Sequence, residues 1–397
     1  MPSTQSTPQA GMQRYLVLLR PDDPAGGART LAELARVAVV SRSDDPSVQR
    51  APCALVFDRI GAARVHCTAQ TWQRLADAAA AGDGAILAIE PERTVYALSA
   101  ARTAASTRGQ DDAGATWGVR AVGAGASSQT GKGIRIAVLD TGLDLAHPDF
   151  AGRDIVSRSF VEGQPVQDGH GHGTHCAGIA AGPAMPGSQP RYGVAGEAGL
   201  YVGKVLGDEG SGGDGGILEG IDWAIGQGCH IISMSLGSPV EPGQGHSVVF
   251  ETVAWRALAA GVLIVAAAGN ESRRPEVIAP VGHPANCPSI LAVAAVDAEL
   301  RVAAFSCAGL EGDGGEVNIA APGVDILSAW PGPTGHRSIS GTSMAAPFVA
   351  GVAALHAQAD PAARGARLGE RLAQSARTLP DPVRDVGAGL VQAPSET

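Results

Sequence analysis

The stretch IRIAVLDTG, residues 134–142, decides the fold class of this chain. Its first six residues are nearly all apolar, and four later runs share this character: YVGKVL (201–206), IISMSL (231–236), VLIVAAA (262–268) and ILAVAAV (290–296). Continuous rather than alternating apolar runs are typical of strands buried on both faces. Helical stretches lie between them, at 216–227 and at 246–259. Strands that alternate with helices predict an α/β fold, with a mainly parallel sheet flanked by helices.

In such sheets ligands bind at the carboxyl ends of the strands, so the residues that follow the apolar runs are candidates for chemistry. Asp140 directly follows the first run, and His172 lies in DGHGHGTHCAG (168–178). Ser343 lies in SGTSMAAPFVAG (340–351), just before an apolar helix. A serine hydroxyl is a weak nucleophile without an adjacent base. A histidine can be that base, and a buried carboxylate can hold its tautomer, so these residue types indicate nucleophilic catalysis.

These motifs resemble the three signatures of the subtilisin-like serine proteases, the subtilases: Asp140 in DTG, His172 in HGTH and Ser343 in GTSMAAP. The order Asp, His, Ser is that of subtilisin itself, so the match is a resemblance and not an independent deduction. It spans about residues 117–393 and includes VAAAGN (265–270). HGTHCAG (172–178) is similar to the motif of proteinase K and thermitase. The resemblance implies a serine endopeptidase of broad specificity that acts on proteins and peptides.

The resemblance also implies an oxyanion hole, made by the backbone N–H of Ser343 and by Asn270. Ser343 lies at a predicted helix N-terminus, where the helix dipole favours negative charge. The implied substrate-binding residues are Gly210, Ser211, Gly212, Ser235, Leu236, Gly237, Ala268, Gly269, Gly282 and His170. The first three match an edge that pairs with an extended substrate as an added strand. Gly282 matches the base of the primary pocket and leaves room for a large apolar P1 side chain.

Further positions carry expectations from the same resemblance. Asp214 stands where relatives often have an aromatic residue, which argues against a strong apolar P4 preference unless Asp214 is an ordinary solvated loop residue. Glu271 lies at the rim of the primary pocket, and His283–Pro284 matches a cis-peptide position. Cys176 is expected to be a small buried residue beneath the imidazole. With the ordinary histidine pKa of ≈6.5, activity is expected to rise from about pH 6 to 8.

No cofactor is expected to be needed for catalysis. Structural calcium is possible, but the sequence does not identify its ligands. Asp149 matches an acid that binds structural calcium in relatives. The accompanying loop, GPAMPGSQPRYG (182–193), has no Asp or Asn and is rich in Pro. Calcium favours several oxygen ligands, often carboxylates, so the common loop site looks degraded here. The acidic stretch 311–316 is an alternative ion site, with a solvated loop as the simpler interpretation.

The first 98 residues follow a β-α-β-β-α-β order, the ferredoxin-like pattern of a small α+β domain. Strands are predicted at 15–20, 54–59, 63–67, 86–89 and 94–98, with helices capped by Thr30 and Thr68. This domain resembles the subtilase propeptide, which implies that its tail (90–98) lies in the cleft as an intramolecular inhibitor. Residues 99–116 are small and polar, which indicates an exposed linker that contains the processing site. We expect self-cleavage between about residues 96 and 115, a peptidase domain at 117–397, and, alternatively, an accessory domain that is never removed.

Composition excludes several classes. The chain has 397 residues, with 29 Lys and Arg against 39 Asp and Glu, for a formal net charge of −10. A nucleic-acid-binding chain is normally basic, so no nucleic-acid partner is expected. No apolar run reaches the ~18 residues of a membrane span. No signal peptide is visible at the N-terminus, so a cytoplasmic location is expected, with secretion as the alternative.

The six cysteines are too few and too scattered for a disulfide scaffold. Cys53 and Cys67 lie symmetrically about residue 60, so they could face each other across the predicted hairpin and form a bridge. The other four show no pairing pattern, which favours free thiols in a reducing compartment.

Other interpretations of the motifs stay open. Asp140 could be half of an aspartic protease dyad, but no second DTG or DSG supplies the other carboxylate. His170, His172 and His175 could instead form a metal site. The alternative function is a pseudoprotease or a permanently inhibited peptide-binding protein, although no residue of the triad or the oxyanion hole is missing.

Overall fold

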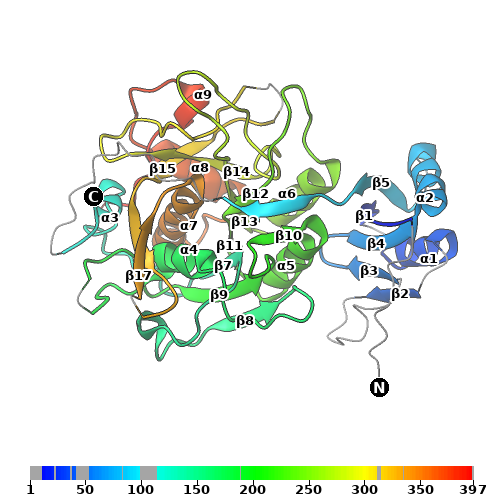
Figure 1. Cartoon of the computed structure of the whole chain (residues 1–397), viewed down its shortest axis with the longest axis horizontal. Coiled ribbons are helices and arrows are strands. Elements are labelled where there is room, and N and C mark those ends of the chain that lie inside the picture. Colours follow the sequence, from blue (N-terminus) through cyan, green and yellow to red (C-terminus); the bar gives the residue numbers. More distant parts are fainter. Residues whose placement is uncertain are drawn as a thin grey trace. The chain divides into compact units, whose positions relative to one another are not determined.

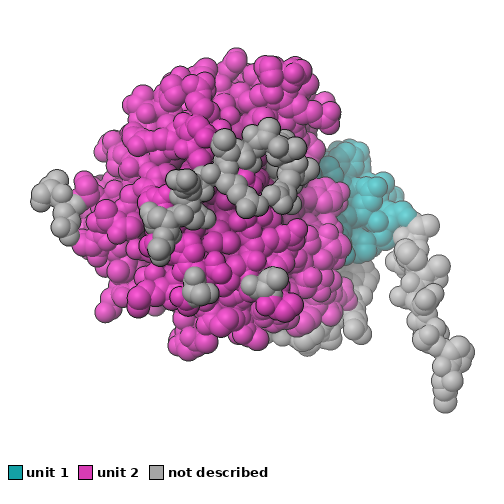
Figure 2. Space-filling model, turned by 60° about the vertical axis from the view of Figure 1, so that its left-hand side comes forward, with its two compact units in different colours: residues 1–93 teal, residues 94–397 magenta. Residues whose placement is uncertain are grey.

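The computed structural model of the chain describes residues 11–21, 24–35, 38–41, 53–82, 84–98, 114–187, 189–310, 314–333 and 335–395. The chain forms two compact units, Met1–Arg93 and Thr94–Thr397 (Figure 2). Among the described residues, we find no helix with the length and apolar character that a membrane span requires. Most of the predicted linker, at 99–113, lies outside the described residues.

The first unit holds a five-stranded sheet in the order β2-β3-β4-β1-β5. Its elements are β1 (Met12–Leu19), α1 (Pro24–Ala35), β2 (Ala38–Ser41), β3 (Cys53–Phe57), β4 (Ala62–Thr68), α2 (Ala69–Ala81) and β5 (Ile86–Pro91). β1 is antiparallel to β4 and β5, whereas β2 is parallel to β3. The two helices contact each other, and each buries one leucine fully, Leu31 on α1 and Leu75 on α2.

The sequence analysis located most of these elements but missed three features. Thr68 caps α2 as predicted, because its side chain accepts the Thr71 N–H. The first helix begins at Pro24 and not after Thr30. Proline is tolerated in the first turn of a helix, where its missing N–H leaves no bond unmade. β2 was not predicted, and residues 94–97 belong to the second unit and not to this sheet.

A bridge between Cys53 and Cys67 requires a strand pairing that differs by one residue from the observed one, so this prediction is wrong. β3 and β4 pair Ala54 with Val65, so residue 53 is not opposite residue 67. Neighbouring residues of a strand point to opposite faces, so a one-residue offset separates two side chains. Cys67 is a free, buried thiol, and the side chain of Cys53 lies outside the described residues.

The second unit is built on a seven-stranded sheet in the order β15-β14-β13-β11-β7-β9-β8. Every neighbouring pair in this sheet is parallel. The strands are β7 (Arg135–Asp140), β8 (Val156–Ser159), β9 (Gly199–Lys204), β11 (Ile231–Met234), β13 (Leu263–Ala267), β14 (Leu291–Val296) and β15 (Ile319–Pro322). The five predicted apolar runs are confirmed as β7, β9, β11, β13 and β14. The edge strands β8 and β15 are short and were missed.

Helices cover this sheet, as the alternating pattern predicts (Figure 1). They are α3 (Trp117–Ala121), η2 (Pro148–Phe150), α4 (His172–Ala181), α5 (Asp214–Gly226), α6 (Val248–Ala259), α7 (Thr342–Ala359), α8 (Ala366–Ser375) and α9 (Val383–Val386). α4 and α7 pack on each other and on the central strands, while α5 contacts β7 and β9, and α6 contacts β13. α4 and nearly all of α7 are fully buried, because their residues are small or apolar on all sides.

Two small sheets complete the second unit. β6 (Thr94–Ala97) lies between β10 (Ser211–Gly213) and β12 (Leu236–Gly237), and β16 (Ile326–Ala329) pairs with β17 (His336–Ile339). β7 ends at Asp140, and β11 and β13 end just before Ser235 and Ala268. The carboxyl ends of parallel strands meet at one edge of the sheet, so these residues are brought to the same region.

Candidate active site

Asp140 and His172 form a buried pair at this edge of the sheet. His172 Nδ1 lies 2.8 Å from Asp140 Oδ1, and the two side chains are 1% and 0% exposed. The carboxylate accepts this bond, so Nδ1 carries the hydrogen and Nε2 is the nitrogen left to act as a base. His172 is the first residue of α4, which begins after Gly171 in a left-handed conformation (φ 103°). Glycine adopts this conformation without steric cost.

The electrostatics of His172 follow from its surroundings. Burial disfavours the charged imidazolium, but the negative charge of Asp140, the hydrogen bond to it and the neighbouring Cys176 together outweigh this effect and raise the pKa of His172 well above its usual 6.5. Cys176 lies one helical turn further along α4, with its Sγ 3.8 Å from His172 Nδ1. Its thiol is fully buried, and burial raises its pKa. Cys176 is therefore the small neutral residue beneath the imidazole that the sequence predicted.

Ser343 lies in the first turn of α7 and is fully buried. Its hydroxyl donates to the carbonyl oxygen of Ser235 at 2.9 Å, and the Ser235 hydroxyl donates to the carbonyl of Ser343 at 2.8 Å. His172 Nε2 has no hydrogen-bond partner among the described residues. Ser343 Oγ must therefore rotate away from Ser235 before it can donate to His172.

The Asn270 side chain is held from both ends. Its Oδ1 accepts the backbone N–H and the hydroxyl of Thr342, each at 2.9 Å. Its Nδ2 donates to the carbonyl oxygen of Leu98 at 2.8 Å. Thr342 directly precedes Ser343, so these bonds fix the amide relative to the helix that carries the serine.

Residues 94–98 lie along the predicted substrate edge as an extended strand. β6 is antiparallel to β10, with Ser211 opposite Tyr96, and is also antiparallel to β12, with Leu236 opposite Ala97. The Ala97 N–H donates to Gly210 at 2.9 Å. The predicted strand-pairing edge at 210–212 is thus occupied by this chain's own backbone.

Gly237 lies beside the Leu98 side chain, and Gly282 and Gly269 are packed too tightly to carry a side chain. A Cβ on Gly237 would lie 3.2 Å from Leu98 Cδ1 and 2.6 Å from the carbonyl oxygen of His283. Gly282 donates to the Ala268 carbonyl at 2.9 Å, and a Cβ there would lie 2.8 Å from the Ser238 oxygen. Gly269 donates to the Thr342 hydroxyl at 3.2 Å. A Cβ on Gly237 or Gly282 would clash with a backbone carbonyl oxygen, and a Cβ on Gly269 would lie 2.6 Å from Glu271 Oε2.

The histidines near the pair separate into distinct roles. The ring centroid of His170 lies 6.2 Å from that of His172, and a Cβ on Gly210 would lie 2.8 Å from His170 Nε2. His170 therefore borders both the pair and the substrate edge. His175 Nε2 instead lies 3.0 Å from two carbonyl oxygens, those of Ile326 and Arg337. Burial lowers the pKa of His175 to about 3, so it is a neutral core residue. No three-histidine metal cluster occurs among the described residues.

Asp214 is not the solvated loop residue that the sequence left open. It begins α5, is 1% exposed, and its Oδ1 lies 2.9 Å from Nε2 of the buried His283. The His283–Pro284 peptide is cis, as the resemblance implied. Glu271 accepts a hydrogen bond from the thiol of Cys307 at 3.1 Å.

Asp168 organises the start of α4 and was missed by the sequence analysis. Its Oδ1 accepts the Gly171 N–H at 2.7 Å and the Thr141 hydroxyl at 2.9 Å. Its Oδ2 accepts the N–H and the hydroxyl of Thr174, at 2.9 and 2.7 Å. One buried carboxylate thus joins the loop after Asp140 to the helix that carries His172. The sequence signal was an Asp-Gly pair shortly before a helix, which is typical of N-terminal capping.

Asp149, the predicted calcium acid, is held by neighbouring aromatic side chains. Its Oδ2 accepts a hydrogen bond from the Tyr192 hydroxyl and lies 2.7 Å from His336 Nε2. This carboxylate oxygen is thus already bonded to two side chains. The prediction that the common calcium site is degraded in this chain stays a prediction.

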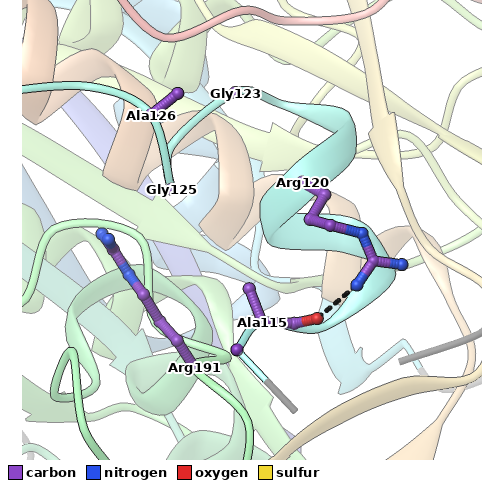
Figure 3. A pocket seen from close by; sticks show the side chains of 7 residues that line it. Ala115, Arg120, Gly123, Gly125, Ala126 and Arg191 are labelled. Carbon is purple, nitrogen blue, oxygen red and sulfur yellow. Dashed lines mark hydrogen bonds between the residues drawn. The ribbon is translucent and has the colours of Figure 1, made fainter. Parts of the chain in front are cut away.

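A pocket of about 530 Å³ lies at the start of the second unit. Figure 3 shows Arg120 and Arg191 on its wall, with the Arg120 Nη1 donating to the Ala115 carbonyl at 2.5 Å. Arg191 donates to the carbonyls of Gly193 and Val194. The pocket contains none of the predicted site residues, and both guanidinium groups bond to backbone.

A parallel α/β domain with a buried Asp–His pair, a serine at a helix N-terminus and a fixed asparagine amide has the site of a serine protease. The subtilase family model matches residues 131–389, and the chain belongs to this family.

Curated relatives include Subtilisin E of Bacillus subtilis (strain 168), 42% identical over 250 residues, or 63% of this chain and 62% of that protein. Subtilisin of Bacillus pumilus is 41% identical over 250 residues, or 63% of this chain and 86% of that protein. Subtilisin Savinase of Lederbergia lenta is 40% identical over 285 residues, or 71% of this chain and 98% of that protein. The chain thus spans less than two thirds of Subtilisin E.

Proposed function

We propose that this chain is a serine endopeptidase made as a self-inhibited zymogen. Ser343 is the nucleophile, His172 takes the proton of its hydroxyl through Nε2, and Asp140 holds the imidazole and stabilises its charged form. The Oγ–carbon bond forms as the carbonyl π electrons move to the oxygen. Asn270 Nδ2 and the Ser343 N–H then donate to this oxyanion. His172 returns the proton to the leaving amine as the C–N bond breaks, which leaves Ser343 acylated. Water then attacks the ester carbonyl while His172 Nε2 takes its proton, and this proton returns to Ser343 Oγ as the Oγ–carbon bond breaks.

The observation that carries this proposal is the bond from Asn270 Nδ2 to the Leu98 carbonyl oxygen, 2.8 Å long. A donor at this distance from a carbonyl oxygen is where an oxyanion hole needs it. The Leu98 N–H lies 3.4 Å from the Ser235 carbonyl, the same oxygen that accepts the Ser343 hydroxyl. Leu98 therefore lies where a P1 residue is attacked, and the bond after Leu98 is the processing site we propose.

The strand that ends at Leu98 also supports self-inhibition. β6 forms backbone pairs on both sides, with β10 and β12, as an added strand would. A product strand that keeps these bonds after cleavage competes with substrate for the same edge. We infer that residues 1–98 then act in trans as an inhibitor, and that 99–116 is the linker lost or trimmed afterwards.

Specificity follows from the residues around Leu98. Gly237 lies beside the Leu98 side chain and has no side chain of its own. Gly282 matches the base of the primary pocket in the subtilase resemblance, so we propose a preference for a large apolar P1 residue. Backbone pairing along β10 recognises any sequence, so we propose broad specificity otherwise. His170 borders the same edge, and its protonation is proposed to alter cleavage beside acidic residues.

Catalysis needs no cofactor in this proposal, because every proton transfer is assigned to a side chain. A cytoplasmic location also stays a proposal. The described cysteines Cys67, Cys176, Cys229, Cys287 and Cys307 are free thiols, which a reducing compartment maintains.

A chromogenic peptide with leucine at P1 tests the activity. Wild type and Ser128→Ala, whose exposed serine lies outside the site, should hydrolyse it at equal rates. Ser343→Ala should lose activity by a factor of about 10⁶, the loss measured in subtilisin itself. If wild type binds the peptide without turnover, the alternative of a pseudoprotease or permanently inhibited peptide-binding protein replaces this proposal.

A further inference from the structure

A second cluster of metal-ligating side chains lies outside the active site. His147, Asp149 and His336 place one ligand atom each within 4.8 Å of one another. His336 Nε2 lies 2.7 Å from Asp149 Oδ2, and His147 Nδ1 lies 4.0 Å from the same oxygen. The side chains are 2%, 9% and 14% exposed, in the order His147, Asp149, His336. The cluster is therefore largely buried, with its most open side at His336.

The hydrogen bonds of His147 leave the nitrogen that faces the cluster unprotonated. Its Nε2 lies 2.5 Å from the Gly335 carbonyl, which can only accept, so Nε2 carries the hydrogen. Its Nδ1 accepts the Asp149 N–H at 3.2 Å and so presents a lone pair. Metal-binding histidines commonly donate their other ring N–H to a carbonyl in this way, which fixes the tautomer. A metal at Nδ1 would replace this long hydrogen bond.

Asp149 is also held in place by a hydrogen bond from a side chain outside the cluster. The Tyr192 hydroxyl donates a hydrogen bond to its Oδ2. Arg153, which lies near Tyr192, donates to the carbonyls of Ala181 and Ala198. The carboxylate is thus the single negative charge among the three ligands.

We propose that His147, Asp149 and His336 bind a divalent transition metal, with Zn²⁺ as the best fit. Two imidazoles and one carboxylate suit Zn²⁺ or Co²⁺, at ligand distances of about 2.0–2.2 Å, with a fourth position for water. Calcium prefers six to eight oxygen ligands, so this donor set does not suit it. At these bond lengths the ligand atoms of a tetrahedral site lie roughly 3.4 Å apart. His336 Nε2, at 2.7 Å from Asp149 Oδ2, must therefore move away from it, and His147 Nδ1, at 4.0 Å, must move closer to admit the ion.

The metal joins two segments far apart in the chain, η2 and the start of β17. His147 and Asp149 follow β7, whose last residue is Asp140. The bound ion therefore stabilises the loop that leaves the Asp140 strand. It adds no step to the peptidase reaction, and the site is independent of the proposed function.

The test is metal titration of the purified, tag-free full chain. The Co²⁺ d–d absorption and Zn²⁺ calorimetry report binding, and the melting temperature reports stabilisation. Another cluster also brings possible ligand atoms together: Asp140, His172 and Cys176. The experiment must therefore distinguish metal binding at this cluster from binding at the proposed site. The variants are His336→Ala, Asp149→Asn and Tyr192→Phe, with His172→Ala for this other cluster. His246→Ala is the matched control, a histidine outside both clusters.

We expect wild type, His246→Ala and His172→Ala to bind one equivalent and to gain melting temperature with Zn²⁺. His336→Ala and Asp149→Asn should lose affinity by about 100-fold or more. Tyr192→Phe keeps all three ligands and should lose roughly 10–100-fold, the usual effect of removing a supporting bond. Near-ultraviolet circular dichroism checks that each variant folds. Absence of binding to wild type at micromolar metal overturns the proposal, as does binding that survives His336→Ala and Asp149→Asn but disappears in His172→Ala.

Discussion

The amide nitrogen of Asn270 donates to the carbonyl oxygen of Leu98 across 2.8 Å, although 172 positions separate the two residues. Thr342 fixes the other end of the same amide, immediately before Ser343. A fixed donor needs no reorganisation as negative charge develops, which is why such donors stabilise transition states well. In the function proposed above, the same pair of atoms would take part both in processing of this chain and in its catalysis.

Asn270→Ala should lower kcat by about 10²–10³ with little change in KM, a magnitude known from subtilisin itself. Only the transition state carries the charge that this amide stabilises, so substrate binding should change little. Peptide hydrolysis over a range of substrate concentrations measures both constants. The melting temperature of the variant is the control for the lost bonds to Thr342. A large rise in KM at unchanged kcat would argue against an oxyanion role.

The pH profile of the processed enzyme should rise with a midpoint above 6.5, the ordinary histidine pKa, because the pKa of His172 is raised. The Asp140 charge favours imidazolium, so His172 becomes a neutral base only above its raised pKa. Asp140→Asn removes this charge while burial still opposes protonation. The midpoint should then move to lower pH, and kcat should fall by about 10⁴. An unchanged midpoint in Asp140→Asn would contradict this electrostatic argument.

Cys176 should make the enzyme sensitive to mercury without being its nucleophile. Its Sγ is 3.8 Å from His172 Nδ1, so a bulky mercurial there displaces the imidazole. A displacement of about 1 Å can cost roughly 10² in rate. Cys176→Ala should keep most activity and lose inhibition by mercury compounds, while a serine-directed reagent still inhibits it. Loss of turnover in Cys176→Ala, with turnover retained in Ser343→Ala, would reverse the assignment.

The buried pair of Asp214 and His283 should matter for stability. Truncating His283 removes its buried hydrogen bond to Asp214 and leaves a cavity beside Phe250, and such a change costs about 3–5 kcal/mol. His283→Ala should therefore reduce the free energy of unfolding by that amount. Arg371 and Asp360 form an exposed pair 3.5 Å apart and provide the control. Arg371→Ala should cost less than about 1 kcal/mol. Equal effects of the two substitutions, measured by denaturant unfolding, would show that burial of the first pair is unimportant.

The parallel sheet was predictable from the sequence because strands that are buried on both faces consist of continuous apolar runs. The short edge strands β8 and β15 lack such runs and were not visible. The proximity of Asp140 and His172 was predictable, since each follows a recognisable motif at one edge of the sheet. Three features depend on contacts between distant segments, which no local pattern encodes: the rotamer of Ser343, the bond between Asp168 and Thr141, and the bond between Asp214 and His283.

The position of residues 94–97 illustrates the same limit. Their alternating pattern predicts a strand, and the structure contains one. The sheet it joins is decided by partners more than 100 residues away, on β10 and β12. A strand with two possible partner sheets cannot be assigned from its own composition.

The most direct test of the central claim is the intact mass of the purified chain, with sequencing of its N-terminus. Self-processing by Ser343 predicts that wild type gains a new N-terminus at residue 99 and that Ser343→Ala retains the original one. Leu98→Asp, which replaces a buried apolar side chain beside Gly237 with a charged one, should be processed far more slowly. A fully active wild type that keeps its original N-terminus, or a Ser343→Ala chain cut after Leu98 at the wild-type rate, would contradict the account.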